Sequence, residues 1–408
     1  MFSSGDRYDL SSLFSNQSLT GATGLLGTSG TSPLSTGQDT SGLFQLLLAQ
    51  MLVKLLDRLE AQVPALTAGL FNSETAAAGL STEAIAPATS STAIRSAYGI
   101  SGSTTSATSD GVLPIASFPR PANDNGRGLH WVPTVSQGAD AVDRFVAEAS
   151  AMNVKWVTFL NDGANIGAND YLVKQLTAAG IEPVMRVYTD GVKPVDGDLG
   201  AMVRHYKALG VDYFQLYNEP NHVVENAGQA PSVYRYLDAW IPAAKAVIAN
   251  GGLPGFGALG PAGEADDLRF LADSITGLKA RGEIDLLDTA WLAIHNYQGD
   301  LPLDDVGGYS RYTAYADVLE KALGRVLPMV STEGGGFART AADEAARTDA
   351  VLAAYNHVAS AAAPDYLFNY TYWVIANAEG GGHDPAWEWQ ALFQNGHTSQ
   401  LVEALKQG

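Results

Sequence analysis

Two glutamates, Glu219 and Glu333, each stand at the end of a short apolar run and before a predicted loop. The runs are YFQLY at 213–217 and LPMVST at 327–332. Hydrolysis of a glycosidic bond requires two carboxyl groups that face each other across a sugar-binding cleft. One is protonated to help the leaving oxygen depart, and in a retaining enzyme the other attacks the anomeric carbon. A spacing of roughly 5 Å would indicate retention, and one nearer about 9 Å would indicate inversion.

Further polar and aromatic residues stand at the carboxyl ends of other strand-like runs. They are His130, Trp131, Asn161, Asp162, Arg186, Tyr188, Asn218, His295, Tyr297 and Trp373. In an α/β barrel these strand ends meet at one rim, which carries the chemistry. A barrel with a purely structural role needs no such collection. We therefore expect substrate contacts from His130, Trp131, Arg186, Asn218, His295, Tyr297 and Trp373.

The elements that must position these residues alternate between strands and helices. Strand-like runs lie at 129–132, 156–160, 183–188, 213–217, 255–259, 290–295, 328–331 and 366–374. Helical stretches lie between them at 139–152, 170–179, 199–209, 232–248, 266–280, 312–323 and 341–361, and Gly180 and Gly210 are expected as left-handed helix caps. Eight such units in about 280 residues predict a (β/α)8 barrel, of class α/β, over residues 128–408. A doubly wound sheet is the alternative, but the phosphate-binding GxGxxG turn that it favours is absent early in the domain.

Four motifs carry a family resemblance: YNEPN at 217–221, HNY at 295–297, STEGG at 331–335 and YWV at 372–374. In their order and strand placement they resemble the clan A retaining (β/α)8 glycoside hydrolases, a group of cellulase-like, mannanase-like and xylosidase-like families. The resemblance implies that Glu219 is the acid/base and Glu333 the nucleophile. It also implies that Asn218 binds the sugar 2-hydroxyl, that Tyr297 bonds to the nucleophile and that Trp373 floors the −1 subsite. Because ionised Glu333 disfavours a second negative charge nearby, we expect a raised pKa for Glu219.

One position departs from the clan pattern. Clan A enzymes often carry an arginine on strand 2 that orients the nucleophile, whereas the second strand here ends in Asn161 and Asp162. Arg186 on the third strand is the substitute that the sequence offers. Its structural alternative is an ion pair with Asp162 or Asp190.

The late loop GGGHDPAWEW offers aromatic surface for sugars. Trp387 and Trp389 lie in it, and aromatic faces match the apolar faces of pyranose rings. We expect Trp387 to contact substrate. His383 and Asp384 precede these residues, but two ligands do not make a metal site. We expect neither a metal nor another cofactor.

Composition narrows the possible partners. The chain of 408 residues has 24 Lys and Arg against 43 Asp and Glu, a formal charge of −19. Such a surface disfavours nucleic acid and anionic membranes. The absence of cysteine excludes disulfides, thiolate metal sites and cysteine nucleophiles.

The first 127 residues differ from the rest, because every Trp and every His lies beyond them. They are rich in Ser, Thr, Gly and Ala, and we expect them to be largely disordered. Leucines at helical spacing predict one amphipathic helix near 43–62, for self-association or for attachment to a surface. The start of the sequence lacks the pattern of a classical signal peptide, which leaves the location open between non-classical export and retention.

Two other functions stay open at this point. The first is a barrel that binds carbohydrate and has lost catalysis, which the intact pair of glutamates argues against. The second is a barrel enzyme that uses a metal or a phosphate substrate, for which the sequence lacks a convincing ligand set.

Overall fold

The computed structural model describes residues 111–408, except 337–339, 341, 342, 378–388 and 395. The predicted helix near 43–62 and the predicted contacts of Trp387 lie outside the described residues. The predicted domain boundary at 127 falls just where the first strand begins.

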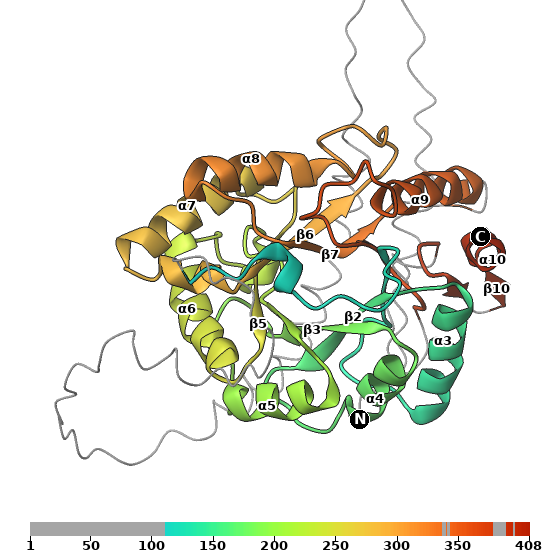
Figure 1. Cartoon of the computed structure of the whole chain (residues 1–408), viewed down its shortest axis with the longest axis horizontal. Helices are drawn as coiled ribbons and strands as arrows, with labels where there is room; N and C mark the ends of the chain where they lie inside the picture. Colours follow the sequence, from blue (N-terminus) through green and yellow to red (C-terminus); the bar gives the residue numbers. More distant parts are fainter. Residues whose placement is uncertain (1–110, 337–339, 341–342, 378–388, 395) are drawn as a thin grey trace, which may run out of the picture. The chain divides into compact units, whose positions relative to one another are not determined.

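Eight parallel strands form the barrel, as predicted (Figure 1). They are β1 (Arg127–His130), β2 (Trp156–Asp162), β3 (Glu182–Tyr188), β4 (Tyr213–Leu216), β5 (Leu253–Leu259), β6 (Trp291–Tyr297), β7 (Met329–Gly335) and β8 (Tyr370–Tyr372). Their order in the sheet is β7-β6-β5-β4-β3-β2-β1-β8. The barrel closes between β7 and β8 through a parallel bridge from Met329 to Leu367.

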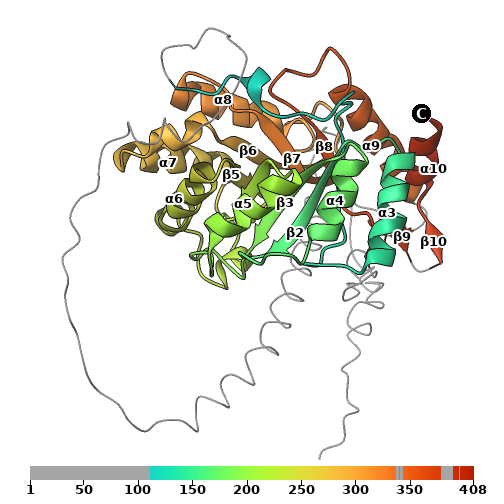
Figure 2. The same cartoon turned by 60° about the horizontal axis from the view of Figure 1, so that its bottom comes forward.

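Helices follow the strands and cover the outside of the barrel (Figure 2). They are α3 (Ala139–Ala151), α4 (Asp170–Ala178), α5 (Leu199–Leu209), α6 (Val233–Ala249), α7 (Asp267–Ala280), α8 (Arg311–Leu323) and α9 (Glu344–Val358). Gly180 and Gly210 follow α4 and α5 with φ of +69° and +107°, which confirms the left-handed caps. None of the helices in the described part of the chain is long and apolar enough to cross a membrane.

Two predicted boundaries were wrong in a way that matters for the site. β7 runs on through Gly335, so Glu333 lies within the strand, whereas we expected it to follow the strand. β8 covers only Tyr370–Tyr372, and the chain before it makes an isolated bridge to β7 at Leu367. A short β9 (Phe393–Gln394), β10 (His397–Thr398) and the helix α10 (Gln400–Gln407), none of them predicted, complete the fold.

Side chains alternate along each strand between the barrel interior and the helices. On β3, Val184 lies in the interior cluster with Trp156, Tyr213 and Trp291, while Met185 and Val187 belong to the core beneath the helices. The amino-terminal end of the barrel is thus filled by large aromatic side chains. The carboxyl-terminal end is left for polar ones.

A segment before β1 packs against the aromatic end of the barrel. It contains a short 3-10 helix, η2 (Ile115–Ser117), drawn in teal in Figure 1. Phe118 is 4% exposed and meets Phe368 edge to face, with ring centroids 6.5 Å apart. The Tyr213 hydroxyl donates to Pro119 O over 2.5 Å. The described fold therefore includes residues that lie ahead of the first strand.

Candidate active site

Strand alternation decides which predicted residues reach the interior. His130 and Arg186 lie at interior positions near the carboxyl ends of β1 and β3, and both are buried. Trp131 follows His130 directly, so its side chain faces the other way. It is fully buried in the outer core, with its ring 6.0 Å from Phe145 of α3, and its indole N–H donates to Gln137. The structure thus places Trp131 among the core residues and not with the predicted substrate contacts.

A β-bulge turns Glu333 into the interior. Ser331 pairs with Ile294 and Glu333 pairs with His295, so Thr332 is an extra residue on β7. A bulge re-aims the side chain that follows it. The bulge is held from outside, where Ser331 Oγ donates to Asn296 Oδ1 over 2.7 Å.

Glu333 has strong hydrogen-bond donors on both carboxylate oxygens. Arg186 Nη2 donates to Oε1 over 2.5 Å, and Tyr297 Oη donates to Oε2 over 2.6 Å. His295 Nδ1 lies 3.7 Å from Oε2. Burial favours the neutral acid, but the neighbouring His295 and the Arg186 guanidinium outweigh it and hold the pKa of Glu333 well below its usual range. Glu333 is therefore a carboxylate at neutral pH, and Arg186 bonds to it and not to Asp162 or Asp190.

Glu219 is presented by an irregular turn after β4. Tyr217 and Glu219 have φ of +67° and +35°, in the left-handed region that non-glycine residues rarely adopt. The turn is fixed to β5, since Glu219 N donates to Ala258 O over 2.9 Å. Such backbone strain is typical of functional sites.

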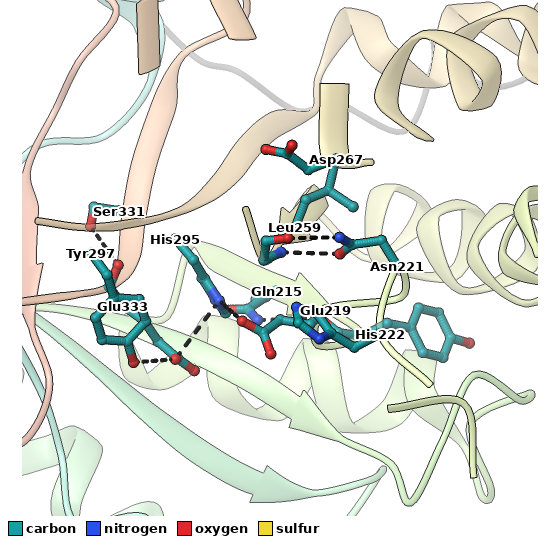
Figure 3. A network of polar contacts seen from close by, with 12 residues as sticks. Gln215, Glu219, Asn221, His222, Leu259, Asp267, His295, Tyr297, Ser331 and Glu333 are labelled. Carbon is teal, nitrogen blue, oxygen red and sulfur yellow. Dashed lines mark hydrogen bonds and ion pairs between the residues drawn. The ribbon is translucent and has the colours of Figure 1, made fainter. Parts of the chain in front are cut away.

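The expectation of a raised pKa for Glu219 was wrong. Burial and the Glu333 charge do favour the neutral acid, but nearby His222 and the hydrogen bond from His295 Nδ1, at 2.9 Å from Oε1, outweigh them and lower the pKa. The second carboxylate alone would raise the pKa of Glu219, but two imidazoles also lie against Glu219 (Figure 3).

The two carboxyl groups and His295 form one compact group. One ligand atom from each of Glu219, His295 and Glu333 lies within 4.8 Å of the others. Among the described residues, this is the group of His and acidic side chains that could hold a metal ion. A cation would compete there with the Arg186 guanidinium, which already neutralises Glu333.

The rings of His130 and Trp373 pack against each other beside Arg186 and Glu333. Their ring centroids are 4.2 Å apart, and the peptide bond after Trp373 is cis. Burial and the Arg186 charge lower the pKa of His130 to about 3, so its imidazole is neutral at physiological pH. Nδ1 contacts Trp131 O at 2.8 Å, which leaves Nε2 without a protein partner among the described residues.

Asn218 lies between Tyr217 and Glu219 and is partly exposed. Its buried Oδ1 has no hydrogen-bond partner within the described part of the chain. Gln215 was not among the predicted site residues. It is buried in the barrel interior, on β4 before the turn that carries Asn218, and pairs in register with Arg186 on β3. The two-residue period from Tyr213 could have identified it.

Comparison with solved structures places the fold. A monomeric beta-xylosidase from Caulobacter crescentus CB15 aligns with a TM-score of 0.51 and 16% identity, covering 71% of this chain and 68% of that one. A GH39 enzyme from Xanthomonas axonopodis pv. citri aligns with a TM-score of 0.51 and 15% identity, over 72% and 67% of the two chains. No protein-family model and no curated protein matches the sequence. The chain is a (β/α)8 barrel with a glycosidase-like fold, which confirms the resemblance to clan A glycoside hydrolases at the level of the fold.

Proposed function

We propose that this protein is a retaining glycoside hydrolase that cleaves O-glycosidic bonds of a polysaccharide or an oligosaccharide by double displacement. The observation that carries the proposal is the spacing of the paired carboxyl groups, whose nearest ligand oxygens lie within 4.8 Å of each other. Retaining enzymes hold their two carboxyl groups about 5 to 5.5 Å apart, whereas inverting enzymes leave room for a water molecule between them.

In the first step Glu333 attacks the anomeric carbon and the bond to the leaving oxygen breaks. Its lowered pKa keeps it ionised, which a nucleophile needs. Arg186 and Tyr297 hold its two oxygens, so the attacking carboxylate is oriented before substrate binds.

Glu219 protonates the leaving oxygen in the first step and takes a proton from water in the second. We place the route of this proton in the hydrogen bond between His295 Nδ1 and Glu219 Oε1, whose atoms are 2.9 Å apart. Entry of a sugar expels water from the cleft, which increases the cost of charge separation in this pair and favours neutral Glu219.

Kinetics of two variants test the proposal. Glu333→Gln removes the nucleophile and should abolish turnover on every substrate. Glu219→Ala should still form the glycosyl-enzyme from an aryl glycoside with an acidic phenol, and added azide should then restore turnover by replacing activated water. The loss on a natural substrate should reach about 10²–10⁴-fold or more. Azide rescue of Glu333→Ala, with Glu219→Ala inert, would reverse the two roles.

A panel of aryl glycosides and polysaccharides separates this function from an inactive carbohydrate-binding barrel. The hydrolase releases phenol from at least one glycoside of the panel, and Glu333→Gln abolishes the release. Binding of a sugar without any release by the wild-type protein would identify the inactive barrel instead.

A further inference from the structure

The third group that lies against Glu219 is His222, from the turn that follows the acid/base. His222 is buried, with its side chain 5% exposed. A Cβ built on Gly260 would lie 2.2 Å from His222 Nε2 and 2.7 Å from Glu219 Oε1. The imidazole nitrogen and the carboxylate oxygen therefore converge on the same side of the Gly260 backbone, where no side chain fits.

Backbone contacts fix the position of this imidazole. His222 N donates to Glu219 O over 2.8 Å, and Asn226 Nδ2 donates to His222 O over 2.7 Å. Two hydrogen bonds join the Asn221 side chain to the Gly260 backbone. Gly260 N donates to Asn221 Oδ1 over 3.0 Å, and Asn221 Nδ2 donates to Gly260 O over 2.7 Å. Figure 3 shows this pair of bonds beside Glu219 and His222.

The other nitrogen of His222 points to a carboxylate of the β5–α7 loop. Glu264 Oε2 lies 3.7 Å from Nδ1 and also accepts a 2.7 Å hydrogen bond from Val223 N. The Glu264 side chain is 40% exposed, whereas His222 is almost fully covered. A row of groups thus runs from solvent at Glu264, through His222, to the partly buried carboxylate of Glu219.

We propose that His222, whose Nδ1 faces the Glu264 carboxylate, is a positioning residue that places a positive charge against the acid/base carboxylate and so sets the pH range in which Glu219 carries its proton. The inference rests on the proposed function for its catalytic meaning. The charged and titratable groups that face this pair are Glu264 from the β5–α7 loop, His295 and Tyr297 from β6 and Glu333 from β7. If His222 served only to shape the turn, its backbone hydrogen bonds would be enough and a charge on its imidazole would have no effect.

The sign of the effect follows from the charge. A protonated His222 favours ionised Glu219, so its removal should raise the pH at which Glu219 loses its proton. We expect a rise of about one pH unit for His222→Gln. Glu264→Gln keeps an oxygen to accept from Val223 N but removes the negative charge, and should shift the value in the same direction by less, because Glu264 is exposed. Glu264→Asp restores the charge and should restore the wild-type value.

The test uses the full chain labelled with ¹³C at the glutamate side-chain carboxyl, with the Glu219 signal assigned by its loss in Glu219→Gln. Titration is followed by NMR for the wild type, His222→Gln, Glu264→Gln and Glu264→Asp. His205→Gln serves as control, because His205 pairs with Asp170 on the outside of the barrel. Thermal melts of each variant accompany the titrations.

An upward shift of the Glu219 midpoint in His222→Gln, absent in His205→Gln, supports the inference. An unmoved midpoint in a folded His222→Gln variant overturns it. If His222→Gln does not fold, the Glu264 variants decide. An upward shift of the Glu219 midpoint in Glu264→Gln that is absent in Glu264→Asp supports the inference, and equal midpoints overturn it. Because the readout is spectroscopic, a shift in a protein that hydrolyses no glycoside would reject the proposed function and keep the charge relationship. If the protein hydrolyses a glycoside and the alkaline limit of its pH–rate profile is the same in the wild type and in His222→Gln, the proposed function is kept and the role of His222 is rejected.

Discussion

Arg186 on β3 donates to Glu333 on β7, with Nη2 and Oε1 2.5 Å apart and both side chains less than a tenth exposed. The two strands stand four places apart in the order of the eight-stranded sheet, so the pair spans the barrel. An arginine on the third strand therefore makes the contact that the clan pattern assigns to the second.

Arg186→Gln should lower kcat/KM by about 10²-fold or more, because Glu333, the proposed nucleophile, loses the guanidinium that keeps its carboxylate ionised and oriented. Arg186 lowers the pKa of Glu333, so its removal should also move the acid limit of the kcat/KM profile to higher pH. A pH–rate profile measures both effects, with Arg269→Gln on the exposed face of α7 as control. An unchanged acid limit would show that Arg186 does not keep Glu333 ionised.

Arg186→Gln should also change the free energy of unfolding in a way that depends on pH. A carboxylate with a lowered native pKa stabilises the fold above its unfolded pKa, and this contribution is lost as the pH falls. Removing one partner of a buried ion pair costs about 3–5 kcal/mol at neutral pH, and Arg186→Gln should lose a smaller amount near pH 4, where Glu333 can accept a proton. Urea unfolding at the two pH values measures the difference. If Arg186→Gln loses the same free energy of unfolding at both pH values, Glu333 is not the charged partner of Arg186 in the native state.

Tyr297→Phe removes the 2.6 Å hydrogen bond to Glu333 Oε2 and keeps the aromatic ring. A hydrogen bond to a charged group contributes about 1.5–3 kcal/mol, which corresponds to a loss of roughly 10- to 100-fold in kcat/KM. Steady-state kinetics on an aryl glycoside give the value. Tyr234→Phe is the matched control, since Tyr234 is 72% exposed on α6, and a similar loss in the control would refute a specific role for Tyr297.

Dialysis against EDTA should leave the rate unchanged. Glu219, His295 and Glu333 are close enough to hold a cation, but the Arg186 guanidinium already neutralises Glu333. The measurement is the hydrolysis rate before and after dialysis, with Zn²⁺, Mn²⁺ and Ca²⁺ added back separately. Loss of activity that a metal restores would favour the metal-dependent barrel enzyme.

Phe118→Ala should destabilise the barrel by about 3 kcal/mol, because it empties a buried site against Phe368. By contrast, a chain shortened to residues 111–408 should keep the fold and the activity, since the residues assembled in the site begin at His130. A cut after residue 127, as the predicted boundary would suggest, removes Phe118 and should lower the midpoint of urea unfolding. Equal midpoints for the two shortened chains would contradict this contribution of Phe118.

The repeated pattern of strands and helices was enough to predict the barrel, and its strand ends were enough to place Glu219, Arg186, His295 and Tyr297 at one rim. The strand period also held information that was not used. His130 and Trp131 are neighbours in sequence, and neighbours on a strand face opposite sides, so the two could not both reach the interior.

Other features depend on contacts that no local pattern encodes. The bulge at Thr332 arises from the register between β6 and β7, and it decides that Glu333 faces His295. The direction of the pKa shift at Glu219 depends on imidazoles that arrive from β6 and from the turn after β4. Long-range pairing brings His295 and Glu333 to Glu219, whereas His222 comes from the same turn, and its effect depends on how that turn folds back onto Glu219.

The most direct test of the proposed mechanism is to trap the covalent intermediate with a 2-deoxy-2-fluoro glycoside that carries an acidic leaving group. The fluorine slows both steps, and the good leaving group allows the first to proceed, so the glycosyl-enzyme accumulates. Intact mass should rise by one fluorosugar, and peptide mapping should place that sugar on Glu333, with retained anomeric configuration in the product of an unfluorinated substrate. A sugar on Glu219, or inverted product from a protein that accumulates no adduct, would contradict the account.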